Sequence, residues 1–535
     1  MATNGVQTRN SKVSDVLTEI GKASLRTIAR LAGLSKDAVR RALKSLDRRG
    51  VYPESSLWKS EVGQAWLYRL LVAVILEFGL KGGVGANRIS SFFHRIHLEK
   101  ELAVSPNALL VLTRKLENLA ITYGQVQEES QAGTLKDIVA AGDETFYNDR
   151  ILLVAMELGT GYLLMEEDSE NRTFETWSGK LQKRLEKIGC HVRYFISDRA
   201  KALVKLAVAG LGCPSGADLF HAQQELTRWL GCGFGRRLGE VKKQIQELQE
   251  TSQALGVTTS ESTKQLLDAV HEYQKRLQEG KEKYRSLLQN ISKIAHPFAL
   301  TGRRKNTPER VEKLNEHARE FSALGEHYGI PDKQGRVRKF SRQIGALSIC
   351  VDAWWLWVEE SIKSLQLDPG MEKYHWVMER LLPKVYWEQQ TTRADTVELR
   401  DAYRAAAQTA LANWQAHPLT TVLPETEMKR LQSWAEWMCR QFQRSSSAVE
   451  GRNGCLAQKY HSSRGLSPRR LKALTVLYNY DTWQADGTTP AERLFATKFP
   501  DLFEWLLREV GPLPAPRSSR QKKKDNPLIL QAVAA

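Results

Sequence analysis

The stretch LKDIVAAGDETFYNDRILLVAMELGTGYLLMEEDS, residues 135–169, decides the fold of this chain. It contains three apolar runs, which are separated by the turn-forming groups ND (148–149) and GTG (159–161). Apolar runs of this length between turn residues are typical of strands joined by short connections. The sequence therefore predicts a meander of three antiparallel strands.

An amphipathic helix and a fourth strand follow the meander. Between Phe174 and Ile188 apolar residues recur at spacings of three and four, and the apolar run HVRYFIS then ends at Asp198. A crossover connection is right-handed and returns to the sheet, so the fourth strand is expected to pair in parallel with the first. Asp143, near the end of the first strand, would then lie beside Asp198.

Two neighbouring carboxylates repel each other unless a cation lies between them. Mg²⁺ and Mn²⁺ prefer oxygen ligands, so the pair predicts a site for a divalent cation. The alternative is that Asp143 belongs to the following turn and that Asp198 only caps a helix. Glu144 competes with Asp143, because side chains alternate along a strand and only one of the two faces the site.

The composition indicates a polyanionic partner. The 535 residues carry a formal net charge of +17, and the excess of Lys and Arg is concentrated toward both ends. The apolar runs are shorter than the ~20 residues that a membrane span needs, and no apolar signal segment opens the chain. The six cysteines form no CxxC pair, which gives no indication of a zinc site. We expect a cytoplasmic protein without membrane contact.

Residues 1–56 are predicted to form a helix-turn-helix DNA-binding region. Ser24 and Ser35 are suitable helix N-caps, and Gly33 suits the tight turn between two short helices. A plain helical hairpin is the alternative. The second helix would present to the major groove four basic residues: Lys36, Arg40, Arg41 and Lys44.

The rest of the chain divides by its apolar pattern. Residues 57–134 are expected to form a second helical DNA-binding region, and residues 135–225 the first part of an α/β core. Within that core, ADLFHAQQEL (217–226) is the candidate for a fifth strand that ends near His221. The chain as a whole is thus a multidomain α+β protein with a mixed five-stranded sheet.

Residues 226–440 are predicted to be an all-helical insertion. It begins with a long antiparallel helical pair, which ends near His296, and continues with helices whose tryptophans are expected to be core. Residues 441–510 would return to the core and continue as C-terminal helices. Residues 511–535 form a basic tail, which is expected to be flexible.

Four segments in this order resemble the DDE transposases of bacterial insertion sequences. They are the strand with DETF, the strand ending ISDRAKAL, the segment SSSAVEGRNG (445–454), and the ending RGLSPRRLKALTVLYNYDTWQADGTTPAERLF (464–495). The resemblance covers about residues 135–495. It implies an RNase H-like, retroviral integrase-like catalytic core with an all-helical insertion. It also implies that two Mg²⁺ or Mn²⁺ ions are bound by Asp143, Asp198 and Glu450.

The resemblance implies a function as well. Such a transposase binds the terminal repeats of its mobile element and cuts and rejoins DNA by two-metal-ion phosphoryl transfer. We expect double-stranded DNA, both element ends and target, as the partner. A homodimer or a higher assembly is expected, in a bacterial cytoplasm with nucleoid association. The alternatives are a helix-turn-helix regulator or inactive transposase relative, and an RNase H-like nuclease that cuts without joining.

Several side chains are candidates for support of this site. Asn453 lies one helical turn beyond Glu450 and is placed to orient it, and His221 is a candidate for contact with the scissile phosphate. A satisfied structural histidine and an ordinary exposed glutamate are the alternatives. The remaining candidates for DNA contact are basic: Arg452, Lys459, Arg469 and Arg470.

Overall fold

The computed structural model describes residues 2–21, 23–49, 58, 60–99, 101–131, 133–147, 150–254, 261–462 and 466–512. The predicted turn at 148–149 and the basic tail from residue 513 onward lie outside these residues. The chain is mostly helical with one mixed five-stranded sheet, and it forms two compact units. One unit comprises Gln131–Cys455, and the other Met1–Ser130 with Leu456–Ala535.

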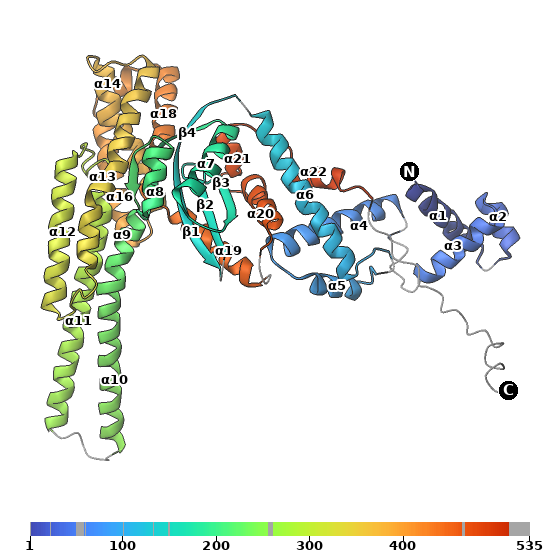
Figure 1. Cartoon of the computed structure of the whole chain (residues 1–535), viewed down its shortest axis with the longest axis horizontal. Helices are drawn as coiled ribbons and strands as arrows, with labels where there is room; N and C mark the ends of the chain where they lie inside the picture. Colours follow the sequence, from blue (N-terminus) through green and yellow to red (C-terminus); the bar gives the residue numbers. More distant parts are fainter. Residues whose placement is uncertain are drawn as a thin grey trace. The chain divides into compact units, whose positions relative to one another are not determined.

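The sheet belongs to the unit Gln131–Cys455 and has the strand order β3-β2-β1-β4-β5 (Figure 1). β1 pairs antiparallel with β2, β2 pairs antiparallel with β3, and β1 pairs in parallel with β4. The predicted meander and the predicted parallel pairing are therefore confirmed. The strands are β1 (Lys136–Tyr147), β2 (Arg150–Glu157), β3 (Leu163–Ser169), β4 (Cys190–Ser197) and β5 (Ser215–Ala217).

The predicted fifth strand is wrong in its position. β5 is only Ser215–Ala217 and pairs in parallel with β4. The segment that we expected to be extended is instead the helix α9, Leu219–Leu226, so His221 lies on a helix. The reason is local: the Asp218 side chain accepts a hydrogen bond from Phe220 N and starts the helix. The buried residues of α9 also follow a helical spacing: Leu219, Ala222 and Leu226.

The predicted crossover helix is α7, Phe174–Ile188, and it packs on the sheet through its apolar face. Thr173 caps its N-terminus, and Gly189 ends it with φ +66°, a conformation that glycine adopts without steric cost. The short helix α8 (Lys201–Lys205) and the π-helical segment η3 (Leu206–Gly210) link β4 to β5.

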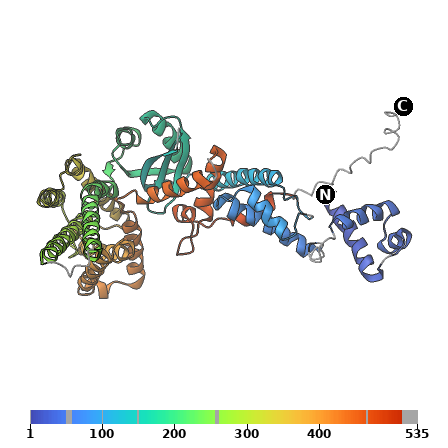
Figure 2. The same ribbon diagram turned by 90° about the horizontal axis from the view of Figure 1, so that it is seen from below.

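Between β5 and α19 the described residues form helices and an isolated bridge between Phe298 and Arg304, and Figure 2 shows these helices gathered into a bundle. α10 and α11 pack side by side as the expected long pair, and α11 ends just before His296. The bounds are η4 (Thr227–Gly231), α10 (Cys232–Ala254), α11 (Glu261–Ile294), α12 (Thr307–His327), α13 (Arg336–Ser361), η5 (Ile362–Leu365), α14 (Glu372–Trp376), η6 (Val377–Leu381), α15 (Leu382–Arg393), α16 (Val397–Gln415), α17 (Leu419–Val422) and α18 (Glu425–Arg440).

Most tryptophans of the insertion lie in its core, as the sequence predicted, whereas Trp414 and Trp437 are only partly buried. Trp354 is fully buried, and its Nε1 donates to the Met438 carbonyl at 2.9 Å. The insertion meets the sheet where α13 packs on β5. Gly216 permits this contact, because a Cβ at that position would lie 2.3 Å from the Cys350 Sγ.

The other unit begins with three helices, α1 (Ala2–Ile20), α2 (Leu25–Ala32) and α3 (Lys36–Arg49). The expected caps are present: Ser24 Oγ accepts from Thr27 N at 3.2 Å, and Ser35 Oγ accepts from Ala38 N at 3.2 Å. Gly33 ends α2 with φ +62°. The two short helices and their turn therefore form as predicted.

The remaining helices of this unit join the two ends of the chain. α20 and α22 pack on α6, so the helices after Leu456 group with the second helical region, whereas we expected them with the core. The bounds are α4 (Glu61–Val74), η2 (Ile75–Lys81), α5 (Ala86–Arg95), α6 (Pro106–Ser130), α20 (Pro468–Asp481), α21 (Pro490–Phe495) and α22 (Leu502–Glu509).

Among the described residues, one helical stretch, Glu61–Lys81, is long and apolar enough to cross a membrane by length and composition. It is longer than the sequence analysis expected. Core helices of soluble proteins meet the same criterion, and 39% of the stretch is buried within the fold.

Candidate active site

Asp143 and Glu144 point to opposite faces of the sheet. Trp177 of α7 donates its Nε1 hydrogen to Glu144 Oε1 at 3.3 Å. On the other face, Asn453 of α19 (Ser447–Ser462) donates its Nδ2 hydrogen to Asp143 Oδ2 at 2.9 Å. The geometry therefore groups Asp143, rather than Glu144, with the helix that carries Glu450.

The segment before α19 is fixed to the sheet and to α9. Gln443 N donates to the Tyr194 hydroxyl of β4 at 2.8 Å, and that hydroxyl also lies 2.9 Å from the Gln443 carbonyl. Leu219 N donates to the Arg444 carbonyl at 3.0 Å. These backbone contacts determine where α19 starts, and so bring Glu450 to Asp143 across a long separation in sequence.

His221 connects Glu450 to a buried aspartate. His221 Nδ1 lies 2.6 Å from Asp218 Oδ2, and its Nε2 lies 3.3 Å from Glu450 Oε1. Asp218 is 1% exposed and also accepts hydrogen bonds from Ser446 N at 3.2 Å and Ser446 Oγ at 2.5 Å. Asp218 and Ser446 were not among the residues predicted from the sequence. An acid three positions before a candidate histidine, at a helix N-cap, was the available signal.

The charges in this cluster are strongly coupled. Burial and the adjacent Glu450 carboxyl raise the pKa of Asp143 to about 7, against an opposing effect of His221. The hydrogen bond to Asp218 raises the pKa of His221 to about 9, and the charges of Asp218, Glu450 and Asp143 act in the same direction. His221 is therefore an imidazolium at neutral pH. Its single positive charge does not balance the carboxylates of Asp218, Asp143 and Glu450 around it.

Asp198 directly follows β4. The last paired residues of the two strands are Ala141 and Ile196, and each lies two positions before an aspartate, Asp143 and Asp198. Asp198 is exposed, and its Oδ1 accepts from Ala200 N at 2.8 Å. It lies close enough to Glu144 to contribute to that residue's raised pKa, after the larger effect of burial. As they stand, no three Asp, Glu, His or Cys side chains of the described residues form a ready metal cage.

The cluster nevertheless offers oxygen donors of the kind that Mg²⁺ takes. Asp143 and Glu450 present carboxyl groups to each other, and burial together with the adjacent Glu450 disfavours the ionised form of Asp143 in the absence of a cation. Asn453 Oδ1 is buried and has no hydrogen-bond partner in the described part of the chain. An orphaned amide oxygen beside two crowded carboxylates fits a hard divalent cation.

The structure gives Arg452 a different role from the expected DNA contact. Its Nε and Nη2 lie 2.6 and 2.9 Å from the two oxygens of Glu166 on β3. Both side chains are buried, with exposed fractions of 7% and 0%. This bidentate ion pair anchors α19 to the sheet and leaves Arg452 unavailable to a phosphate.

The other basic candidates fall into two groups. Arg469 and Arg470 donate from Nε to the buried Glu117 of α6 at 2.7 and 3.0 Å, which joins α20 to α6. Lys459 donates to the Lys81 carbonyl. The side chains of Arg469, Arg470 and Lys459 therefore bind other residues of their own helical unit. By contrast, the four residues proposed for the major groove are all exposed on α3: Lys36, Arg40, Arg41 and Lys44.

A family model described as "Family of unknown function (DUF6399)" matches residues 377–522. This part of the chain runs from the end of the helical insertion through Glu450 to the C-terminal helices. A comparison with curated proteins finds no match to the chain.

Proposed function

We propose that the protein is a DNA transposase whose core cuts and rejoins phosphodiester bonds at a site formed by Asp143, Glu450 and, from the end of β4, Asp198. The observation that carries the proposal is the meeting of β1 and α19. Asn453 and Asp143 are hydrogen-bonded although they lie 310 positions apart, and Glu450 joins them from the same helix. The strand order and directions are those expected of an RNase H-like core.

In this proposal Asp143 and Glu450 would hold Mg²⁺ or Mn²⁺, and Asp198 would complete the set from the end of β4. Bound there, the ions would supply Lewis-acid chemistry for an in-line phosphoryl displacement, namely activation of the attacking oxygen and stabilisation of the departing one. Asn453 keeps Asp143 in position through its Nδ2 and offers its free Oδ1 to the same ion site.

His221 is the positively charged side chain of the proposed site, in addition to any bound metal ion. Asp218 accepts from Nδ1 and fixes the orientation of the ring, so that the Nε2–H of the imidazolium points at Glu450. A scissile phosphate bound at that cluster would accept a hydrogen bond from this imidazolium. Charge-assisted hydrogen bonds of this kind are about twice as strong as neutral ones.

DNA recognition is assigned in the proposal to α2 and α3. The pair has the arrangement of a helix-turn-helix, and the exposed basic residues of α3 would enter the major groove. The net charge of +17 supports a polyanionic partner of this kind.

The test uses purified protein and a labelled DNA fragment that contains the sequences bordering the gene. The proposal predicts Mg²⁺-dependent cleavage of that fragment, followed by covalent joining of the labelled end to a target plasmid. Cleavage without joining would instead identify an RNase H-like nuclease. Binding without cleavage under Mg²⁺ or Mn²⁺ would identify a DNA-binding regulator or an inactive relative.

A further inference from the structure

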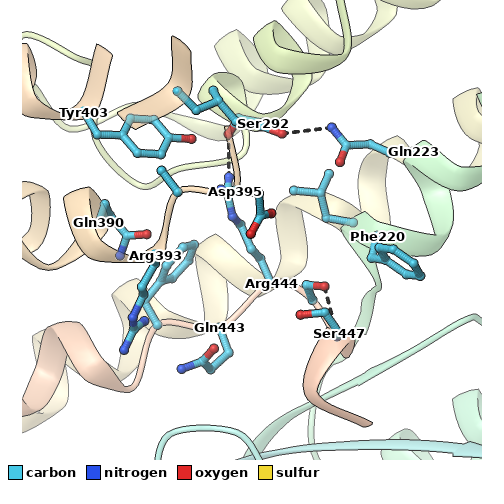
Figure 3. Close-up of a pocket in the computed structure, with 15 residues that line it drawn as sticks. Phe220, Gln223, Ser292, Gln390, Arg393, Asp395, Tyr403, Gln443, Arg444 and Ser447 are labelled. Carbon is cyan, nitrogen blue, oxygen red and sulfur yellow. Dashed lines mark hydrogen bonds between the residues drawn. The ribbon is translucent and has the colours of Figure 1, made fainter. Parts of the chain in front are cut away.

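A polar cavity of about 220 Å³ lies next to the candidate active site, within the same unit (Figure 3). One wall comes from α9, another from α15 and the turn after it, and a third from residues 442–447. Phe220 in the first wall precedes His221, and Ser447 in the third is the first residue of α19. The cavity therefore shares two of its walls with the carboxylate cluster.

The segment before α19 lies between the carboxylate cluster and the cavity and contacts both. Ser446 turns its hydroxyl to Asp218 on the side of the carboxylate cluster. Its neighbours Arg444, Ser445 and Ser447 line the cavity on the other side. A strand of DNA whose phosphate lies at the cluster would thus find the cavity next along its path.

The cavity contains one arginine that is fixed and one that is free. Arg444 donates from Nη1 to the Ser292 carbonyl at 2.5 Å, as the dashed line in Figure 3 marks. Arg393, at the end of α15, is exposed to the cavity, and the described residues provide its guanidinium with no hydrogen bond or ion pair. Asp395 lies on the same wall and forms no ion pair with either arginine. The cavity therefore holds two guanidinium groups and one carboxylate, and Arg393 is its arginine without a hydrogen-bonded partner among the described residues.

We propose that this cavity binds a backbone phosphate of the DNA strand that passes through the active site, with Arg393 as the contacting residue. The inference rests on the proposed function and adds a second anchoring point for its substrate. A guanidinium presents a planar fork of donors that matches two phosphate oxygens. The hydroxyls of Ser445 and Ser447 line the same space and can act as further donors.

The test measures binding of a fluorescein-labelled, mixed-sequence single-stranded oligonucleotide to the full-length protein in EDTA, at several salt concentrations. We expect Arg393→Gln to weaken binding about tenfold, because a lost charged hydrogen bond is worth at least one such factor. The slope of log K against log salt should fall by about 0.7, the value for one phosphate contact on a single strand.

Three further variants complete the design. Arg404→Gln on α16 is the matched control, because that exposed arginine is already paired with Asp401 at 2.9 Å, and it should bind as the wild type does. Asp395→Asn removes the acid from the cavity and should tighten binding several-fold. Arg393→Lys keeps the charge and should keep the salt slope while it loses part of the affinity.

Equal binding by Arg393→Gln and Arg404→Gln overturns the proposal. If Arg393→Gln does not fold, Asp395→Asn decides: tighter binding supports the phosphate site, and unchanged or weaker binding overturns it. All measurements are made without a divalent cation, so they are independent of catalysis. A protein that binds as expected but cleaves no DNA would contradict the proposed function and leave the cavity assignment standing.

Discussion

At the residue scale, Asp143 is the side chain through which the candidate site lowers the stability of the fold. Its pKa of about 7 is raised above the value of an exposed aspartate, so the folded protein holds a proton between about pH 4 and 7 that the unfolded chain releases. This group therefore stabilises the fold less and less as the pH rises through that range. A cation bound between Asp143 and Glu450 would remove the penalty.

Asp143→Asn is accordingly expected to stabilise the metal-free protein most at pH 8 and clearly less at pH 5. A shift of about three pKa units corresponds to about 4 kcal/mol as an upper value. The measurement is thermal unfolding in EDTA at both pH values. Asp198→Asn, the same change at an exposed carboxylate, is the control. A difference between Asp143→Asn and wild type that does not grow with pH would contradict the assignment.

The pair of Arg452 and Glu166 allows a second prediction at this scale. Arg452→Met leaves a buried carboxylate without its partner, and such changes cost about 3 to 5 kcal/mol. The melting temperature should therefore fall, and Glu166→Gln in the same chain should restore part of it. Weaker DNA binding with an unchanged melting temperature would instead support the DNA contact that the sequence suggested.

At the scale of elements, the strands were predictable and the connections between distant segments were not. Apolar runs and turn residues predict β1 to β4 from local pattern alone. β5 was misplaced because the Asp218 side chain starts α9 immediately after it. Arg452, Arg469 and Arg470 looked like DNA contacts because their partners lie 286, 352 and 353 positions away.

The contact of α13 with β5 gives a prediction for this scale. Gly216→Ala would place a Cβ 2.3 Å from Cys350 Sγ, and such overpacking costs about 1 to 3 kcal/mol. The packing of α13 on β5 should weaken, and thermal unfolding would detect this as a lower melting temperature. Cys350→Ala in the same chain should relieve the clash. Gly345→Ala on α13 has open space around it and should be neutral or stabilising, by up to about 1 kcal/mol. Equal effects of the two glycine substitutions would contradict this packing.

The basic face of α3 is tested by its salt dependence. Replacing Arg40 and Lys44 with Gln should reduce the slope of log K against log salt by about 0.9 for each duplex phosphate contact that is lost. Arg276→Gln, on the surface of α11 and paired with Glu272, is the matched control. An unchanged slope in the double variant would remove α3 from the DNA interface.

At the scale of the whole molecule, the candidate site is assembled from the two ends of a long insertion. Asp198 precedes the helical bundle and Glu450 follows it, 252 positions later. The order and context of the motifs predict the three carboxylates of the proposed site, and the contact of Asp143 with the helix of Glu450 supports two of them. It did not supply Asp218, which acts through a histidine and resembles an ordinary helix cap. A site that depends on such long-range contacts becomes visible only in the folded structure, where the segment with Glu450 lies beside the sheet.

The most direct test of the central claim is Mg²⁺-dependent cleavage of the gene's flanking DNA by four variants of the full-length protein. Asp143→Asn, Asp198→Asn and Glu450→Gln should each lose cleavage while they keep DNA binding. Asp401→Asn, an exposed acid of the insertion, should cleave as the wild type does. Full cleavage by any of the first three variants would contradict the account.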